Sequence, residues 1–379
     1  MNQFMFKGKF GLERETLRVD KNNRLAQTLH PFQDENLSRD FCENQLEIIT
    51  PVCNSISEVM SSLAMLDKKA REILKQNDES LWLYSNPPYI QNDEEIPIAK
   101  YDGMLSAKHD YRISLARRYG KRMMLYSGIH FNFSFSEEYL ENLNQEKNQA
   151  YFRLSKQVSK YSWLLVLLMS ASPMYDLSFD KDNASGMAFS GYSSMRNSKR
   201  GYWNQFIPEL DYSSLASYIN SIQNYIKKGI LFSAGELYLP VRLKPKGENS
   251  LEKLLNTGVD HIELRMFDLN PLEKLGVAQK DLEFAHLFLI YLLNLEDFNF
   301  TPDLQKQAIE NHQNAAFYDI SNIKINHISI LDSANNFLDA MQGFFKYIPE
   351  TQKIINYQRN KLNSQRLCEK IKAGSEIYV

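Results

Sequence analysis

Strict alternation of apolar and polar residues over short segments is the feature that most limits how this chain can fold. The pattern occurs in residues 10–19, 42–50, 126–135, 236–243 and 261–267. In residues 126–135, for example, four apolar side chains alternate with Gly128, His130, Asn132 and Ser134. Because successive side chains of a β-strand point to opposite faces, each segment predicts a strand with one apolar and one polar face.

Other parts of the chain carry apolar residues every three to four positions, which is the spacing of an amphipathic helix. The predicted helices span residues 54–76, 145–169, 213–228, 279–295, 330–345 and 351–371. The apolar run at residues 163–169 is far shorter than the roughly 20 residues of a membrane span, so we interpret it as part of a buried helix. Together the patterns predict an α+β fold in which helices cover the apolar face of an antiparallel sheet.

Length and composition are those of an ordinary folded protein. The chain has 379 residues and a formal net charge of -2, which gives no reason to expect nucleic acid or a membrane as partner. No repeat and no domain boundary is evident, so we expect residues 1–379 to form a single domain, as a monomer or weak oligomer. The N-terminal segment lacks the apolar region of a signal peptide, and Cys42, Cys53 and Cys368 form no CxxC pair. We therefore expect a cytoplasmic protein with buried, unpaired cysteines.

Acidic side chains gather on the polar faces of the predicted strands. The acids in question are Glu13, Glu15, Asp40, Glu47 and Glu263. One interpretation is that these faces are simply exposed to water, where glutamate is ordinary. If the strands instead line a shared concavity, the carboxylates would repel one another unless cations were bound. Mg²⁺ is a hard cation that prefers oxygen ligands and suits such a cluster.

One histidine and three arginines could join these acids if the predicted strands line one concavity. His130 is either a further metal ligand or a hydrogen-bonded structural residue. Arg196, Arg242 and Arg265 can each place a forked guanidinium on phosphate oxygens. Acids, metal and arginines together indicate phosphoryl transfer. The chain has no Walker A motif and no GxGxxG loop, so ATP would be held by metal ions and strand residues.

These motifs resemble, in order and in spacing, those of the bacterial glutamate–cysteine ligases. The matching motifs lie at residues 10–19, 40–51, 127–134, 196–202, 236–240 and 263–271. The resemblance spans residues 10–277 and implies a single catalytic ligase domain built like glutamine synthetase. In that fold an antiparallel sheet curls into a half-barrel, helices cover its outside, and the active site lies on the concave face.

The resemblance also implies roles for individual residues. The metal ligands would be Glu13, Glu15, Asp40, Glu47, His130 and Glu263, around two or three Mg²⁺ ions, with Mn²⁺ as the alternative metal. The catalytic residues would be Glu13, Glu263 and Arg265, and Arg265 would meet the transferred phosphoryl group. The substrate-binding residues would be Arg196, Tyr202, Tyr238, Tyr111, Leu115 and Met124. Some relatives have glutamine at the position of Met124, so the acceptor pocket of this chain is more apolar.

The implied reaction joins the γ-carboxylate of glutamate to the amine of cysteine, with ATP as co-substrate. Because a carboxylate is a poor electrophile, ATP would first convert it to γ-glutamyl phosphate. The product, γ-glutamylcysteine, is made in the first step of glutathione biosynthesis. No ATP-grasp-like segment follows the ligase motifs, so we expect no glutathione synthase activity on this chain.

Three other functions stay open at this point. The chain could be a ligase that joins glutamate to another amine, because the metal and phosphate residues would be identical. It could also be a phosphotransferase that releases the acyl phosphate, or a binding protein that kept the fold without catalysis. The matched acidic positions and His130 are all intact, which argues against loss of catalysis.

Overall fold

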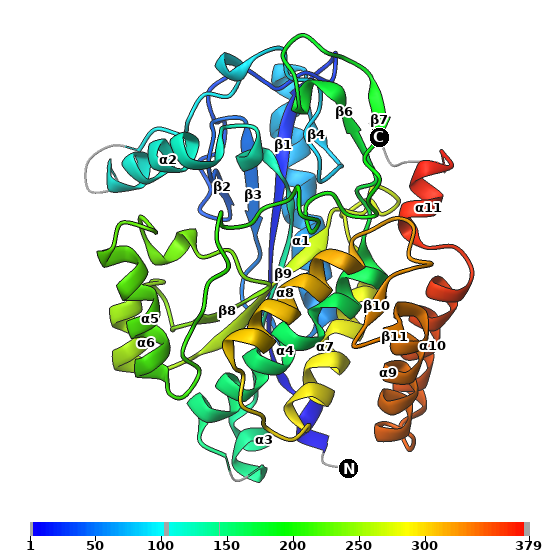
Figure 1. Cartoon of the computed structure of the whole chain (residues 1–379). Coiled ribbons are helices and arrows are strands. Elements are labelled where there is room, and N and C mark those ends of the chain that lie inside the picture. Colours follow the sequence, from blue (N-terminus) through cyan, green and yellow to red (C-terminus); the bar gives the residue numbers. More distant parts are fainter. Residues whose placement is uncertain (1–2, 102–105, 144, 375–379) are drawn as a thin grey trace.

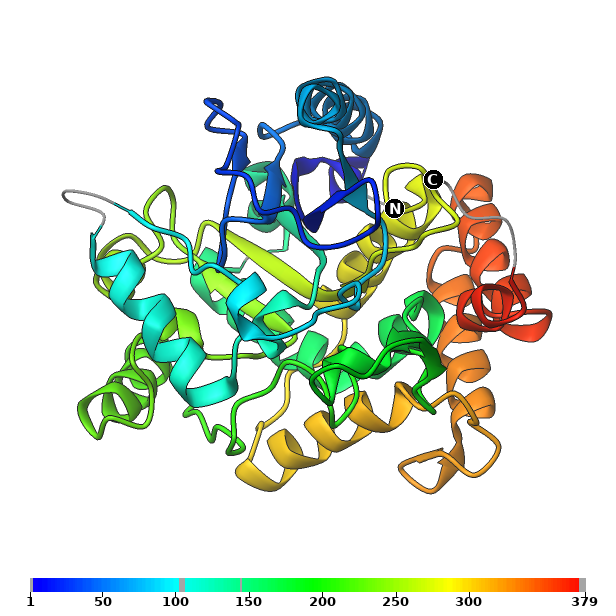
Figure 2. The ribbon, with the colours of Figure 1, turned by 90° about the horizontal axis from the view of Figure 1, so that it is seen from above.

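The computed structural model describes residues 3–101, 106–143 and 145–374. An antiparallel sheet runs through the middle of the molecule, and helices lie around it (Figures 1 and 2). The strand order is β2-β3-β1-β5-β9-β8, and β4 also pairs with β1. The strands are β1 (Gly8–Asp20), β2 (Leu37–Ser38), β3 (Gln45–Ile49), β4 (Glu79–Trp82), β5 (Gly128–Phe135), β8 (Val241–Lys244) and β9 (His261–Asp268).

Helices and two small hairpins complete the described structure. The hairpins pair β6 (Met174–Asp176) with β7 (Met187–Phe189), and β10 (Lys324–Ile325) with β11 (Ile328–Ser329). The helices are α1 (Ile56–Leu74), α2 (Ser106–Tyr119), α3 (Glu137–Asn142), α4 (Lys147–Met169), α5 (Leu215–Lys227), α6 (Leu251–Thr257), α7 (Gln279–Leu293), α8 (Pro302–Ala315), α9 (Ile330–Phe344), α10 (Pro349–Asn363) and α11 (Leu367–Lys372). None of these helices has both the length and the apolar character needed to cross a bilayer.

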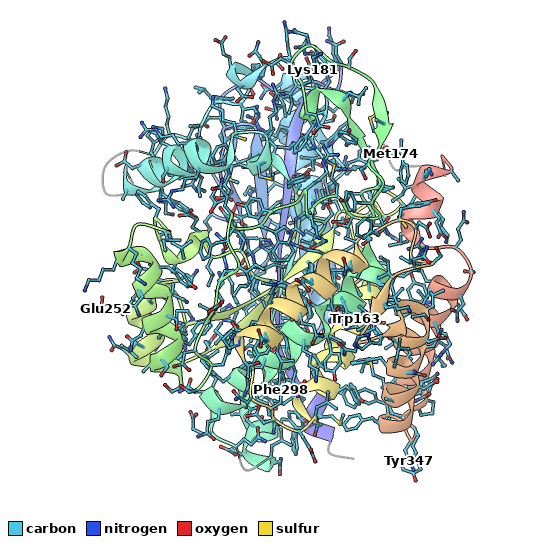
Figure 3. All side chains as sticks on the ribbon, in the orientation of Figure 1. Trp163, Met174, Lys181, Glu252, Phe298 and Tyr347 are labelled. Carbon is cyan, nitrogen blue, oxygen red and sulfur yellow. The ribbon has the colours of Figure 1, made fainter. Side chains whose placement is uncertain are left out.

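The apolar face of the sheet is covered, as the alternation predicts. Phe131 and Phe133 on β5 and Leu264 on β9 are fully buried in the main core, together with residues of α1, α4 and α7. Trp163, in the apolar run of α4, is buried there too (Figure 3). Burying each large apolar side chain contributes about 1.5–3 kcal/mol, so this packing holds the sheet to its helices. The polar faces of the same strands therefore point to the other side of the sheet.

Two predicted strands are shorter in the structure. The segment 236–243 forms a strand only from Val241, because Glu236 ends a 3-10 turn and is buried against other elements. Its carboxylate accepts from the Tyr119 hydroxyl at 2.8 Å and pairs with Arg118 at 3.3 Å. The segment 42–50 forms a strand only from Gln45, whose side-chain oxygen accepts from the backbone N–H of Phe41 at 2.7 Å. Local side-chain bonds of this kind compete with sheet pairing.

The helix prediction for residues 351–371 is wrong in one respect, because the segment holds two helices. α10 ends at Asn363, and α11 begins where the Glu369 carboxylate accepts from the backbone N–H of Arg366 at 2.9 Å. The other predicted helices are present with ends that differ by a few residues, whereas α2, α3, α6 and α8 were not predicted. α8 nevertheless carries clear start signals, since Thr301 caps it and Pro302 occupies its first turn. The three cysteines are buried and free, as expected.

Candidate active site

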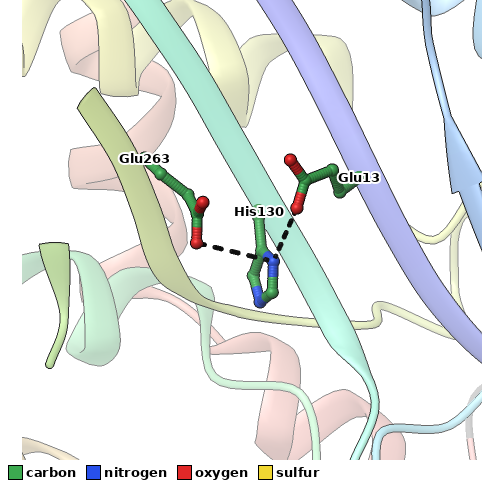
Figure 4. Close-up of side chains that lie close together, drawn as sticks. All are labelled: Glu13, His130 and Glu263. Carbon is green, nitrogen blue, oxygen red and sulfur yellow. Dashed lines mark hydrogen bonds and ion pairs between the residues drawn. The ribbon is translucent and has the colours of Figure 1, made fainter. Parts of the chain in front are cut away.

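Three side chains from neighbouring strands meet on the polar face of the sheet (Figure 4). Glu13 comes from β1, His130 from β5 and Glu263 from β9. His130 Nδ1 lies 3.2 Å from Glu13 Oε2 and 3.9 Å from Glu263 Oε1. One potential ligand atom of each residue lies within 4.8 Å of the others. The group therefore has the size and the donor atoms of a cation site.

A β-bulge lies beside this group. Ile129 pairs with Phe267 and Phe131 pairs with Leu264, so two residues of β9, Arg265 and Met266, face the single position of His130. Bulges locally bend a strand and change where side chains point, and they recur next to active sites. In this structure the Arg265 guanidinium pairs with the carboxylate of Glu263 two residues earlier.

A second acidic group lies on the other side of His130. Glu15 and Glu47 stand directly opposite each other on β1 and β3. His130 Nε2 lies 3.7 Å from Glu15 Oε1. Asp40 follows β2 and is placed differently, because its carboxylate accepts from Arg112 of α2 at 3.1 Å and is 48% exposed. The structure thus brings five of the six predicted metal ligands to one region, and Asp40 lies at its border, where its carboxylate pairs with Arg112 while its charge still acts on Glu47.

Glu47 is the acid of this group whose pKa is raised. Burial raises the pKa of Glu47 well above its ordinary value, and the negative charges of Glu13, Asp40, Glu15 and Glu263 raise it further. Burial and the neighbouring negative charges both disfavour the ionised form of this carboxyl group. A bound cation would relieve that repulsion.

Two other acids have lowered pKa values. Burial raises the pKa of Glu263, but the charges of Arg265, Lys244 and His130 prevail and hold it well below its ordinary value. Burial and Glu263 likewise raise the pKa of Glu13, and its hydrogen bond to His130 outweighs them together with nearby positive charge. Glu13 and Glu263 are therefore carboxylates at neutral pH, which is the form that binds a metal.

The residues present fit a hard divalent cation. His130 Nε2 and Asn132 Oδ1 are buried without a hydrogen-bond partner. Buried polar atoms of this kind are rare and call for a partner such as an ion or water. Carboxylate, amide and imidazole donors together are suited to Mg²⁺ or Mn²⁺.

Arg196 lies against the backbone of β9. Its guanidinium donates to the carbonyl oxygens of Arg265 at 2.7 Å and Phe267 at 3.3 Å. A Cβ atom at Gly128 would lie 2.6 Å from Arg196 Cζ, and one at Gly201 would lie 1.7 Å from the Arg196 carbonyl oxygen. Both glycines are needed because larger residues would occupy the space that Arg196 takes.

The predicted substrate-binding residues lie together. A cavity of about 30 Å³ is lined by Arg196, Tyr202, Tyr238, Arg265 and His312, among others. Tyr111, Leu115, Met124, Tyr202 and Tyr238 all belong to one apolar cluster. The rings of Tyr202 and Tyr238 lie 4.1 Å apart, and the Tyr202 hydroxyl is 3.8 Å from the sulfur of Met124. Burial raises the pKa of Tyr111 to about 12, so its hydroxyl stays neutral.

Sequence reasoning missed two polar residues of the site. Lys244 Nζ lies 2.6 Å from Glu263 Oε2, and Asn132 Nδ2 donates to Glu13 Oε1 at 3.1 Å. Asn132 is part of the alternating pattern of β5, and Lys244 follows Arg242 by two residues, so both share the polar faces. The structure directs Arg242 to the backbone instead, since it donates to the carbonyl oxygens of Gly235 and Leu237 at 2.6 and 3.0 Å.

Comparison with known proteins identifies the family. The family model described as glutamate-cysteine ligase matches residues 1–230 and 226–315. The chain belongs to the glutamate–cysteine ligase family. This membership confirms the resemblance that the motifs indicated.

Individual relatives agree with that assignment. The chain is 38% identical to the glutathione biosynthesis bifunctional protein GshAB of Listeria innocua, over 96% of this chain and 51% of the relative. It thus spans about half the length of these curated relatives. It is 32% identical to the glutamate–cysteine ligase of Clostridium acetobutylicum, over 83% of this chain and 78% of that protein.

The fold agrees with solved structures as well. The glutamate–cysteine ligase of Francisella tularensis, solved in complex with AMP, matches with a TM-score of 0.89 and 25% identity over 97% of this chain and 84% of that one. A bifunctional glutathione synthetase from Pasteurella multocida matches with a TM-score of 0.85 and 25% identity over 98% of this chain and 50% of that one. The predicted α+β fold class, resembling glutamine synthetase, is confirmed.

Proposed function

We propose that the chain catalyses the ATP-dependent ligation of the γ-carboxylate of glutamate to the amine of cysteine. The product would be γ-glutamylcysteine, and the reaction the first step of glutathione biosynthesis. The observation that carries the proposal is the group of Glu13, His130 and Glu263, with Arg265 paired to it, in a chain of the glutamate–cysteine ligase family. Its substrates would be glutamate, cysteine and ATP.

The acids around His130 would hold the metal. The proposed ligands are Glu13, Glu15, Asp40, Glu47, His130 and Glu263, with Mg²⁺ as the metal and Mn²⁺ as the alternative. When bound, such ions neutralise phosphate charge and orient the phosphate groups of the nucleotide. The raised pKa of Glu47 and the unpartnered atoms of His130 and Asn132 support this assignment.

Arg265 would stabilise the transferred phosphoryl group. In the first step an oxygen of the glutamate γ-carboxylate attacks the terminal phosphorus of ATP, and the bond from that phosphorus to ADP breaks. Negative charge spreads over the transferred group, and a guanidinium matches it with two parallel hydrogen bonds. Arg265 is 14% exposed on the site side and already binds one carboxylate, Glu263, so it can reach an anion there.

The amine would attack in the second step. The nitrogen of cysteine forms a bond to the acyl carbon, the bond from that carbon to the phosphate oxygen breaks, and inorganic phosphate leaves as the amine loses a proton. Arg196 would bind a carboxylate of an amino-acid substrate, because it is buried and its guanidinium donates, within the described residues, only to backbone carbonyls. Tyr202 lies beside it in the same cavity and would share that role.

The apolar cluster around Tyr238 would hold the side chain of the acceptor. Tyr111, Leu115, Met124 and Tyr238 belong to this cluster. Sulfur is polarizable and packs well against aromatic rings and methionine, so a thiol suits this surrounding. Because position 124 is methionine rather than glutamine, this side of the pocket is apolar and would also accept an acceptor that carries a methyl group in place of the thiol.

The chain would act as one catalytic domain, monomeric or weakly associated, in the cytoplasm. Site residues come from β1 at one end of the motif region and from β9 at the other, and they share one sheet. Near the C-terminus, Lys361 of α10 pairs with Asp281 of α7 at 2.7 Å, and both side chains are buried. The C-terminal helices thus pack on the same core. Light scattering of the purified protein would test the predicted monomer.

The test is ADP release by the purified protein with ATP and Mg²⁺. Glutamate alone, glutamate with cysteine, and glutamate with a panel of other amines are compared, and product masses are recorded. We expect cysteine to stimulate most strongly and to give a product with the mass of γ-glutamylcysteine. If another amine stimulated ADP release more strongly, that amine would replace cysteine as the proposed acceptor. Phosphate transfer without any amine would indicate a phosphotransferase. If no amine stimulated ADP release, the ligase proposal would be wrong.

A further inference from the structure

Lys244 binds the buried carboxylate at the centre of the site. It is the last residue of β8, the edge strand of the sheet, and it pairs with His261 in the ladder with β9. Its ammonium nitrogen lies 2.6 Å from Glu263 Oε2, and its side chain is only 15% exposed. Glu263 itself is fully buried. The sequence analysis assigned no role to this lysine.

Glu263 therefore carries two positive side chains. Arg265 pairs with Oε1 and Lys244 pairs with Oε2. Oε1 is also the oxygen that faces His130. A divalent ion bound by Glu13, His130 and Glu263 must share the Glu263 carboxylate with these cations. Charges of equal sign within about 4 Å repel strongly in a partly buried site, so one cation has to move away.

Lys244 is the side chain better suited to move. Within the described residues, Glu263 is the only side chain with which the Lys244 ammonium forms an ion pair or hydrogen bond. A lysine ammonium sits on a flexible stem of four carbons and can reorient by changing rotamers. Once separated from Glu263, however, the ammonium would be a largely buried charge without a partner. That state costs free energy unless another anion replaces the carboxylate.

We infer that Lys244 forms its ion pair with Glu263 while the site is free of metal and nucleotide. Once a divalent ion binds that carboxylate, the Lys244 ammonium binds the phosphate chain of ATP instead. This role rests on the proposed function, because it requires a metal–nucleotide complex in the site. The nucleotide supplies the anion that arrives together with the metal. An ammonium is a common phosphate ligand in proteins, acting as a point charge rather than as a fork. Lys244 would thus keep the buried carboxylate compensated in the empty site and contribute to nucleotide binding in the filled one.

The experiment compares Lys244→Met with Lys246→Met. Lys246 lies two residues further on and is exposed, so its variant makes the same change of charge away from the site. Binding of Mn²⁺ alone to the nucleotide-free protein is measured by electron paramagnetic resonance. We expect Lys244→Met to bind Mn²⁺ about tenfold more tightly than the unchanged protein, because a repelling charge is gone. Lys246→Met should bind it with unchanged affinity.

Nucleotide binding gives the second readout. We expect Lys244→Met to raise the KM for ATP about tenfold or more, the usual effect of losing one hydrogen bond to a charged group, and to leave the KM for glutamate unchanged. Weaker or unchanged Mn²⁺ binding would overturn the inference. A raised KM for glutamate with an unchanged KM for ATP would overturn the phosphate assignment. Thermal unfolding is followed for each variant, and Lys244→Gln replaces Lys244→Met if the latter does not fold.

The same measurements separate this inference from the proposed function. Mn²⁺ binding requires no turnover, so it tests Lys244 even in an inactive protein. If the unchanged protein shows glutamate-dependent ATP turnover while Lys244→Met binds Mn²⁺ normally, only the role of Lys244 is wrong. If the unchanged protein shows no such turnover with any amine, the proposed function itself is wrong.

Discussion

Arg14 and Glu13 are neighbours in the sequence but lie on opposite faces of β1, and the charges around them differ. On the covered face, Arg14 pairs with Asp67 of α1 at 2.7 Å, and both side chains are at most 2% exposed. The second oxygen of Asp67 accepts from Arg71 at 2.8 Å. On the site face, Glu13 lies beside Glu263 and near Glu47, so negatively charged side chains repel one another there.

Arg18 repeats the pattern of the covered face. Its guanidinium pairs with Glu79 at 2.6 Å and also donates to the hydroxyl of Thr28 at 2.8 Å and to the carbonyl of Glu43 at 2.9 Å. One guanidinium atom of Arg18, Nε, is buried without a partner, as are His130 Nε2 and Asn132 Oδ1 on the site face, so the two faces differ mainly in how their charges are matched. Buried charges that are closely matched hold elements together, whereas unmatched acids create a place for cations from outside. The pairing of charges, more than burial or net charge, therefore distinguishes the covered face from the candidate site.

The largest effect is expected on the covered face. Asp67→Asn removes the anion between Arg14 and Arg71, and leaves Arg14 buried without charge compensation. Breaking a buried ion pair in this way costs about 3–5 kcal/mol. The free energy of unfolding, measured with urea, should fall by that amount. Glu72→Gln is the control, because its ion pair with Lys68 is exposed and should contribute at most about 1 kcal/mol. Equal losses in both variants would contradict the contrast between the faces.

The next effect is expected on the site face, and on turnover rather than stability. Arg265→Lys keeps the charge but loses the forked geometry that matches a phosphoryl group. We expect turnover in the ADP-release assay to fall about 100-fold or more, with the unfolding midpoint nearly unchanged. Arg117→Lys, on the exposed surface of α2, is the matched control and should keep full turnover. Near-normal turnover of Arg265→Lys would rule out the assigned role.

A smaller effect is expected from the crowded acid. Because the pKa of Glu47 is raised in the folded protein, the folded state keeps a proton that the unfolded chain releases. The metal-free protein should lose stability as pH rises from the ordinary glutamate pKa, about 4.3, through the raised folded value.

Glu47→Gln should remove part of that loss, so the metal-free variant should be the more stable protein at neutral pH. Unfolding midpoints measured across pH in a chelating buffer check the difference. Glu310→Gln, an exposed change on α8, is the control and should show the same pH dependence of the unfolding midpoint as the unchanged protein. A Glu47→Gln profile parallel to the unchanged one would show that Glu47 is not repelled by its neighbours.

The smallest effect is expected in the acceptor pocket. Met124→Gln places a polar amide near the Tyr202 hydroxyl, which now faces the methionine sulfur at 3.8 Å. We expect the preference for cysteine over 2-aminobutyrate, in which a methyl group replaces the thiol, to rise within about tenfold. The ratio of the two kcat/KM values measures this preference. An unchanged ratio would mean that Met124 does not contact the acceptor side chain.

Much of the site could be predicted from local patterns. The alternation in β1, β5 and β9 placed Glu13, His130 and Glu263 on polar faces, since strand geometry depends only on neighbouring residues. The predicted strand at 236–243 begins only at Val241, because Glu236 is held by Arg118 and Tyr119, which lie more than 100 residues away in the chain. No local pattern carries that information.

The sequence by itself determined the family and the fold class and indicated the candidate site residues, because motifs and periodicity are local properties. Only the tertiary structure decided which charges meet. The strand order β3-β1-β5-β9-β8 places His130 between two groups of acids, and the bulge in β9 sets Arg265 beside it. The contacts of Lys244 with Glu263 and of Arg112 with Asp40 arise in the same way. Their distances depend on how strands and helices pack, which spacing along the chain does not specify.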